Sequence, residues 1–164
     1  MRVLVHAAIG IVTLWLQLTV APLLAIGGYR PNLLLLTVGI MAMRWLEPWL
    51  FVYAVLAGLA LDAFSHGILG VYGLSFFAAF FIARLIGLSV YENNLLVGVV
   101  GVFGICLAEG IFAITLFQWL DPSVPWWRWL GTQVIPGALV NALWSPLVFW
   151  ALGRLERWAR PLEA

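Results

Sequence analysis

The segment Leu95–Leu120 reads LLVGVVGVFGICLAEGIFAITLFQWL, and it decides the fold class of this protein. It carries one charged side chain, Glu109, in a run longer than the ~20 residues that a helix needs to cross a bilayer. Outward from it, further apolar runs fill nearly the whole chain. They predict helices at Val3–Leu24, Pro31–Leu46, Trp49–Phe64, Ile68–Leu88 and Leu130–Leu152. The breaks between them are short and polar, or proline-rich as in residues 121–128, where we expect a loop.

Composition supports a membrane protein. Of the 164 residues, 65% are hydrophobic and 9% are charged, and the mean hydropathy is +1.08. A soluble domain carries about 25% charged residues, so this chain has too little polar surface to cover a water-soluble globule. We predict an all-α integral membrane protein in which residues 1–153 form one domain of six transmembrane helices and residues 154–164 form a basic cytoplasmic tail. The net charge of +1 argues against nucleic acid as a partner.

The arginines predict the orientation of the chain in the membrane. An even number of spans places both termini on one side, and cytoplasmic loops are enriched in Arg and Lys. With cytoplasmic termini, the inner face would hold Arg2, Arg44, Arg84, Arg154, Arg157 and Arg160, and the outer face only Arg30 and Arg128. We therefore expect both termini on the cytoplasmic side.

The second and third expected helices are short. Pro31 is expected to begin the second one, because a first helical turn needs no N–H at that position. About 16 residues give a length of ~24 Å, less than the ~30 Å hydrocarbon core. Three explanations remain open: burial against neighbouring helices, local thinning of the membrane, or a less regular structure.

The third expected helix carries a stripe of small residues that ends in an acid. Ala54, Gly58 and Asp62 recur at a spacing of four, on one helix face, and small residues in this register let two helix backbones approach closely. Asp62 could shape a ligand pocket or bind a partner at the outer mouth, next to Ser65 and His66. We favour the other interpretation, in which it hydrogen-bonds the turn before the next helix or has a purely structural role.

Glu109 is the one acid near the centre of an expected span. A charge there costs about 2.5–3.5 kcal/mol on insertion scales, so its side chain should face the bundle. Polar side chains at similar depth could join it in one buried cluster: His6, Thr13 and Gln17 on the first helix, and Gly137, Asn141 and Ser145 on the last. An ion or proton relay is one interpretation. We favour interhelical hydrogen bonding, because no Arg inside the membrane is available as a partner.

Catalytic and metal-binding patterns are missing from the sequence. His6 and His66 are the only histidines, and the expected topology places them at opposite faces of the membrane, whereas a metal site needs several converging ligands. The chain has no G-x-S-x-G, no Walker A loop and no H-E-x-x-H. We predict no enzymatic activity, no metal and no cofactor.

Three motifs carry a resemblance to a known family. They are Arg30-Pro31-Asn32-Leu33-Leu34-Leu35-Leu36, then Gly58-Leu59-Ala60-Leu61-Asp62, then Gly67-Ile68-Leu69-Gly70. Their order and spacing, together with the total length, resemble the rod shape-determining protein MreD family. The resemblance covers about 60 residues and makes the motif residues candidates for a structural or partner-binding role: Pro31, Asn32, Gly58, Asp62, Gly67 and Gly70, beside Glu109 and Asn141.

The resemblance implies a multi-pass scaffold in the bacterial plasma (inner) membrane, without enzymatic activity, that takes part in cell elongation and peptidoglycan synthesis. It implies an MreC-like bitopic membrane protein as the direct partner. Through that partner the chain would connect to RodA, a class B penicillin-binding transpeptidase and MreB filaments. The family also resembles, in fold, the S-components of energy-coupling-factor vitamin transporters, an analogy that transfers no function.

A second class of function stays open beside the scaffold. The chain could be the substrate-capture subunit of a small-molecule, vitamin-type transporter. Such a subunit should show several polar side chains that converge on an open cavity, and the sequence offers mainly Asp62 and His66 at the outer mouth. An intramembrane enzyme has still less support.

Overall fold

The computed structural model describes residues 2–45, 47, 49–65, 68–90, 94–123 and 125–159. These residues form helices and no strand, apart from one isolated bridge between Ile26 and Tyr29. The helices are α1 (Arg2–Thr19), α2 (Leu33–Arg44), α3 (Leu50–Ser65), α4 (Val71–Val90), α5 (Leu95–Leu120), α6 (Trp126–Trp129) and α7 (Ile135–Ala159), with a π-helical turn, η1 (Leu130–Val134), between the last two. The all-α prediction is confirmed.

Several predicted boundaries are wrong. The first helix ends at Thr19 and not at Leu24, and two further errors involve proline. α2 begins after Asn32, whose side chain caps the helix, so Pro31 lies outside the first turn. At the other end of the chain, the helix starts at Trp126 directly after Pro125, although a loop was expected through residue 128. Because both prolines of this segment precede the first turn, neither interrupts it.

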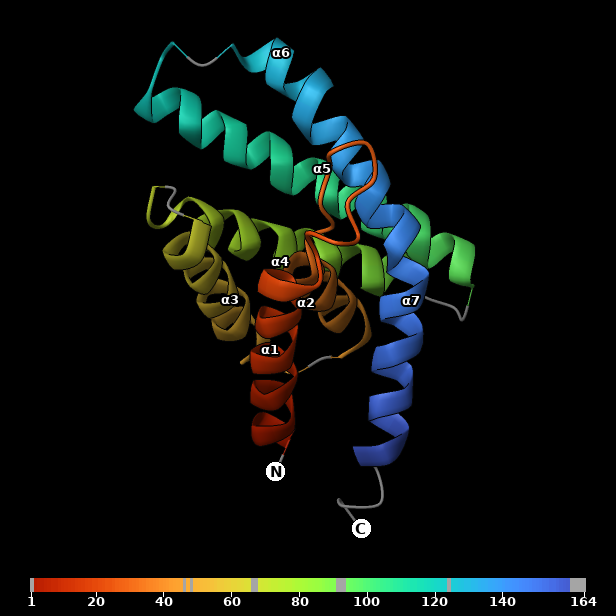
Figure 1. The fold of residues 1–164 in the computed structure, drawn as a ribbon. Coiled ribbons are helices and arrows are strands. Elements are labelled where there is room, and N and C mark those ends of the chain that lie inside the picture. The colour runs from red at the N-terminus through yellow and green to blue at the C-terminus, as the bar shows by residue number, and fades with distance from the viewer. Residues whose placement is uncertain are drawn as a thin grey trace.

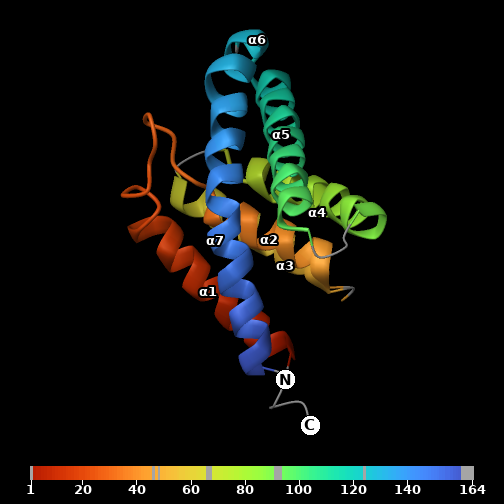
Figure 2. The same cartoon turned by 90° about the vertical axis from the view of Figure 1, so that its right-hand side faces the viewer.

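The last three elements join into one continuous helical rod. It runs from α6 through η1 into α7, and it passes Gly153 without a break to end at Ala159. Residues 154–159 of the expected tail therefore continue the last helix, and residues 160–164 lie outside the described part. The N-terminal end of α1 and the C-terminal end of α7 lie side by side at one end of the molecule (Figures 1 and 2).

α2 lies at the centre of the bundle. Ten of its twelve residues are buried, as expected for a helix that is apolar on all sides, and it contacts α1, α3, α4, α5 and α7. The backbones of α2 and α4 approach closely at Gly87, where an added Cβ would lie 2.5 Å from the Met43 carbonyl oxygen. Of the three explanations for the short second helix, burial against its neighbours is the one that the structure supports.

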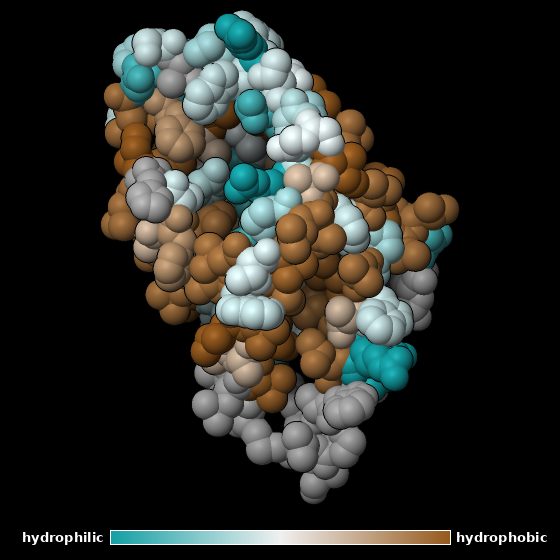
Figure 3. Space-filling view, viewed as in Figure 1, coloured by the Kyte–Doolittle hydropathy of each residue, from teal (hydrophilic) through white to brown (hydrophobic). Residues whose placement is uncertain are grey.

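Apolar side chains cover much of the outer surface. Large exposed examples occur on α1, α3, α4, α5 and α7, including Ile11, Leu56, Leu85, Val100 and Leu143. On the face seen in Figure 3, hydrophobic residues form a broad brown area across the middle of the molecule, and polar residues gather around the α6 end. Two helical segments, Leu95–Leu120 and Trp126–Leu155, are long and apolar enough to cross a bilayer, and the other apolar helices are shorter.

Candidate functional site

Asp62, near the end of α3, binds the backbone at the start of α4. Its side chain is 2% exposed and accepts three backbone hydrogen bonds. The Gly70 and Gly73 N–H groups donate to Oδ2 at 2.9 and 3.1 Å, and the Tyr72 N–H donates to Oδ1 at 3.1 Å. These donors are the free N–H groups at the start of α4, where a negative charge is also favoured by the helix dipole. Asp62 therefore caps α4 from the preceding helix, which is the hydrogen-bonding role considered from the sequence.

Two glycines make this cap possible. Gly70 has a φ of +100°, a conformation open to glycine, and as a glycine it supplies no capping side chain of its own. An added Cβ at Gly58 would lie 2.3 Å from the Tyr72 carbonyl oxygen and 2.7 Å from the Gly73 Cα. Gly58 thus allows the backbones of α3 and α4 to approach until Asp62, one turn further on, reaches the N–H groups. Gly67 and His66 lie outside the described residues.

The start of α2 is held by side chains from three parts of the chain. Asn141 of α7 accepts a hydrogen bond from the Asn32 N–H at 2.7 Å, and Gln17 of α1 accepts one from the Leu33 N–H at 2.6 Å. The Asn32 side chain accepts the Leu35 N–H at 3.1 Å, and the Gln17 amide donates to the Pro31 carbonyl at 3.3 Å. Pro31 and Asn32 therefore belong to a junction of α1, α2 and α7.

The other end of α2 is bound as well. The Arg84 guanidinium of α4 donates to the Trp45 carbonyl oxygen at 2.6 Å, where a cation also complements the helix C-terminus. His6 of α1 packs edge-on between Trp45 and Trp49, with ring centroids 4.6 and 4.7 Å away. Side chains of other helices thus bind backbone groups at both ends of this short buried helix.

Two prolines in the last rod each leave a carbonyl without its helical donor. Proline has no N–H, so Pro136 cannot donate to Thr132 and Pro146 cannot donate to Ala142. The Tyr29 hydroxyl donates to the Thr132 carbonyl at 2.7 Å, and the Ser145 hydroxyl donates to the Ala142 carbonyl at 2.7 Å. The turn η1 ends at Val134, two residues before Pro136, and contains Thr132, whose carbonyl would clash with the proline ring in a regular helix.

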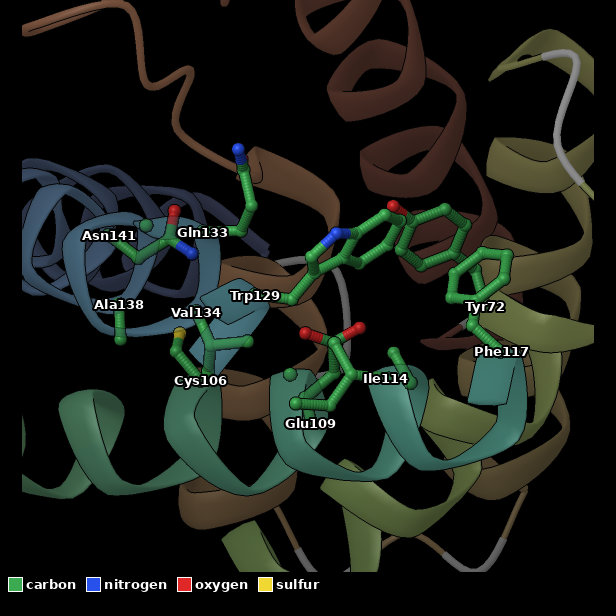
Figure 4. Close-up of a pocket in the computed structure, with 13 residues that line it drawn as sticks. Tyr72, Cys106, Glu109, Ile114, Phe117, Trp129, Gln133, Val134, Ala138 and Asn141 are labelled. Carbon is green, nitrogen blue, oxygen red and sulfur yellow. The ribbon is translucent and has the colours of Figure 1, made fainter. Parts of the chain in front are cut away.

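A cavity of about 450 Å³ lies between α5 and the η1–α7 part of the rod, with one wall from α4 (Figure 4). Its lining residues are Tyr72, Cys106, Glu109, Gly110, Ala113, Ile114, Phe117, Trp129, Gln133, Val134, Gly137, Ala138 and Asn141. The volume falls in the range of ~300–1,000 Å³ that is typical of small-molecule sites. Figure 3 shows the surface hollowed in this region, with polar side chains around the hollow.

Glu109 projects into this cavity. Figure 4 shows its carboxyl group below Trp129, with Tyr72 and Phe117 on one side and Asn141 on the other. The side chain is 8% exposed, and Oε1 is buried without a hydrogen-bond partner among the described residues. An unpaired buried carboxyl oxygen costs about 1–3 kcal/mol or more. Among the described residues, the Tyr53 hydroxyl and the Trp144 indole N–H are also buried without a partner, and Glu109 is the only acid in this group.

The single polar cluster expected around Glu109 is divided in the structure. Asn141 lines the cavity, as expected, but its Oδ1 binds the start of α2. Gln17 binds the same helix start, and the Thr13 hydroxyl donates to the Ile9 carbonyl of its own helix at 2.7 Å. The Ser145 hydroxyl donates to the Ala142 carbonyl. Glu109 therefore shares a cavity with one of its expected neighbours and binds none of them.

Sequence reasoning missed several residues of the site. Gln133 extends the predicted Gly137–Asn141 stripe by one step of four, so the helical spacing could have found it. Tyr29 has a weaker signal: Pro136 leaves one carbonyl free, and the sequence does not say which hydroxyl reaches it. Trp129 lies on α6, directly before the predicted start of the last helix at Leu130, so no sequence pattern placed it beside Glu109. Among the described residues, no group of three or more His, Cys, Asp or Glu side chains could hold a metal ion.

Comparisons with known proteins returned no match of this chain to a protein-family model, a curated protein or a solved structure.

Proposed function

We propose that this chain is a six-span membrane scaffold of the bacterial cell-elongation machinery, similar to MreD, and that it binds an MreC-like bitopic protein in the plasma membrane. The proposal rests first on the sequence resemblance. The structural observation that best supports it is the role of the resembling motifs at helix ends. Arg30–Leu36 contains the start of α2, and Gly58–Asp62 and Gly70 form the cap of α4. Residues used in this way build a framework and take no part in chemistry.

The hydrogen bonding of backbone N–H and C=O groups at the ends of α2 supports insertion into a bilayer. Inside hydrocarbon, free N–H and C=O groups must be bound by the protein itself. At about 1.5 Å per residue, α2 is only ~18 Å long, so its ends would lie within the ~30 Å core. Side chains bind them at both ends, through Gln17, Asn32 and Asn141 at the start and Arg84 at the finish. The exposed apolar side chains of the outer helices are then the lipid-facing surface.

The orientation with both termini in the cytoplasm is part of the proposal. The two chain-terminal helix ends lie at one end of the molecule (Figure 1), as an even number of spans requires. Arg44, at the end of α2, and Arg154 lie toward that end through Gly153, whose added Cβ would be 3.4 Å from the Arg44 guanidinium. This grouping agrees with the Arg-rich inner face expected from the sequence.

Depletion in a rod-shaped bacterium that carries this chain tests the scaffold function. We expect the cells to become round as the protein is lost, and a plasmid copy of the chain to restore the rod shape. Normal rods after complete depletion would contradict the proposal. The control is uptake of vitamins by the same cells, which a scaffold leaves unchanged.

The cavity favours a second candidate function, the substrate-capture subunit of a small-molecule transporter. A carrier needs polar groups that converge on an open space, and Glu109, Gln133 and Asn141 all line this space of about 450 Å³. The same depletion separates the two functions, because loss of uptake with normal cell shape indicates the carrier.

A further inference from the structure

We propose that the cavity between α5 and α7 is a binding site for a primary ammonium group, with the Glu109 carboxylate as its anionic partner. The ammonium group could belong to a free amine or to a phospholipid headgroup such as that of phosphatidylethanolamine. This inference does not rest on the scaffold function, because it follows from the cavity and its lining alone.

The first observation is the unpartnered acid. Glu109 is almost fully buried, points into the cavity and leaves Oε1 without a hydrogen-bond donor. The lining contains no Arg, Lys or His that could neutralise it. A buried carboxyl group that is not paired within the chain is neutralised either by a proton or by a cation from outside the chain, and the cavity gives such a cation access to Glu109.

The second observation is the aromatic wall beside the carboxylate. Phe117 and Trp129 lie 6.1 Å apart between ring centroids, and Tyr72 forms the wall next to them. The negative faces of aromatic rings attract ammonium groups, and Trp is the strongest of them. A carboxylate flanked by three aromatic rings selects an organic cation over a neutral or anionic ligand.

The third observation is the shape of the helix that lines the cavity. The π-helical turn η1 supplies Gln133 and Val134 to the lining, and its Thr132 carbonyl is held by Tyr29. π-helical turns occur frequently at functional sites. Here Val134 of η1 packs against α5 at Gly110, where an added Cβ would lie 2.5 Å from the Val134 side chain, and the cavity opens beside this contact.

A pair of matched ligands tests the charge requirement on the unaltered protein. Ethanolamine is protonated at neutral pH and carries an NH₃⁺ group at the position where 1-propanol carries a CH₃ group. We expect the full chain in phosphatidylcholine nanodiscs to bind ethanolamine at least about ten-fold more tightly, the difference made by one charge-assisted hydrogen bond. Saturation-transfer NMR measures both ligands. Equal binding of the two, with no preference for the lipid ammonium group below, overturns the proposal.

Matched variants place the preference at Glu109. Glu109→Gln keeps the size of the side chain and removes its charge, so the preference for ethanolamine should disappear. Asp121→Asn is the control, since Asp121 is exposed and outside the cavity. The Ser123 hydroxyl and N–H, which donate to Asp121, lower the pKa of its carboxyl and keep it ionised. A Glu109→Gln protein that retains the wild-type preference contradicts the proposal.

A second experiment, with lipids, distinguishes a free amine from a lipid headgroup as the source of the ammonium group. The full chain is placed in nanodiscs with equal amounts of phosphatidylethanolamine, phosphatidylcholine and phosphatidylglycerol, and native mass spectrometry identifies the retained lipid. Preferential retention of phosphatidylethanolamine, lost in Glu109→Gln, identifies a headgroup site. Binding of ethanolamine without lipid preference identifies a free amine. Neither preference, in a protein that remains folded, refutes the site.

Discussion

Asp62 and Glu109 are two buried acids in very different surroundings. Asp62 accepts three backbone N–H bonds, and its charge lies at the start of α4. Glu109 has a carboxyl oxygen that binds nothing. Asp62 uses its oxygens to bind the backbone of α4, whereas Glu109 keeps a carboxyl oxygen that a ligand could bind. The difference arises because the start of α4 faces Asp62, whereas α5 presents Glu109 to an opening beside η1.

Replacing Asp62 should destabilise the whole bundle. Asp62→Ala leaves one buried and two partly buried N–H groups without an acceptor. A buried group costs about 1–3 kcal/mol, so we expect a total loss of about 3 kcal/mol. Asp62→Asn retains one acceptor oxygen and should lose less. Thermal unfolding in detergent measures both, and Asp121→Ala, at an exposed site, serves as the control. Equal stability of Asp62→Ala and wild type would disprove the capping role.

Ser145 and Pro146 should be energetically coupled. Ser145→Ala removes the donor to the Ala142 carbonyl and should cost about 1 kcal/mol. Pro146→Ala restores a backbone N–H to that carbonyl, so Ser145→Ala in this background should have little effect. A double-mutant cycle on unfolding midpoints gives the coupling. Additive effects would mean that the hydroxyl does not replace the missing N–H.

At the level of residues, sequence patterns identified polar positions better than their partners. The spacing of Asn141 and Ser145 marked them as inward-facing, and both are buried. Their partners are backbone groups of Asn32 and Ala142, which depend on where α2 starts and on the proline one residue after Ser145. The second of these could be read from the sequence, but the first requires the tertiary arrangement.

At the level of elements, the short helix α2 organises the molecule. Its twelve residues pack among five other helices, and its two ends bind side chains from α1, α4 and α7. Hydropathy predicted its existence and its shortness. It could not fix the start, because Pro31 suits a first helical turn as well as the position before an Asn cap. The hydrogen bonds from the Asn32 and Leu33 N–H groups to Asn141 and Gln17 hold Asn32 in the capping position, so the helix begins at Leu33.

The close approach of α3 and α4 depends on Gly58. Gly58→Ala places a Cβ against the Tyr72 carbonyl, a backbone atom that cannot move without shifting α4. We expect a loss of about 1–3 kcal/mol. Gly104→Ala on α5 is the matched control, since nothing lies within 4 Å of its added Cβ, and it should be neutral or slightly stabilising. Unfolding in detergent compares them, and equal stabilities would contradict the packing argument.

At the level of the whole molecule, the apolar runs predicted the number and order of the helical rods. They failed at the last rod, which is longer at both ends than expected because α6 and η1 continue into α7 and α7 passes Gly153. The cavity could not be predicted, since it forms where the π-helical turn meets α5. Neither helix contains a sequence signal for a gap between them.

The proposed orientation makes a prediction for the complete chain. Both termini should be cytoplasmic, because the Arg-rich end and the two terminal helix ends coincide. Fusions to green fluorescent protein and alkaline phosphatase at the C-terminus report the side. Fluorescent but phosphatase-inactive fusions are expected, and a C-terminal phosphatase fusion that is active in the periplasm would exclude this topology.

The partner is the most direct test of the scaffold. The intact chain is purified from detergent-solubilised membranes of its own bacterium, and quantitative mass spectrometry identifies the proteins that accompany it. The account predicts an MreC-like single-span protein as the main partner, retained with Glu109→Gln because the cavity is not the contact. Co-purification with an ABC-type ATPase pair, together with tight binding of a vitamin, would contradict the scaffold and establish the carrier.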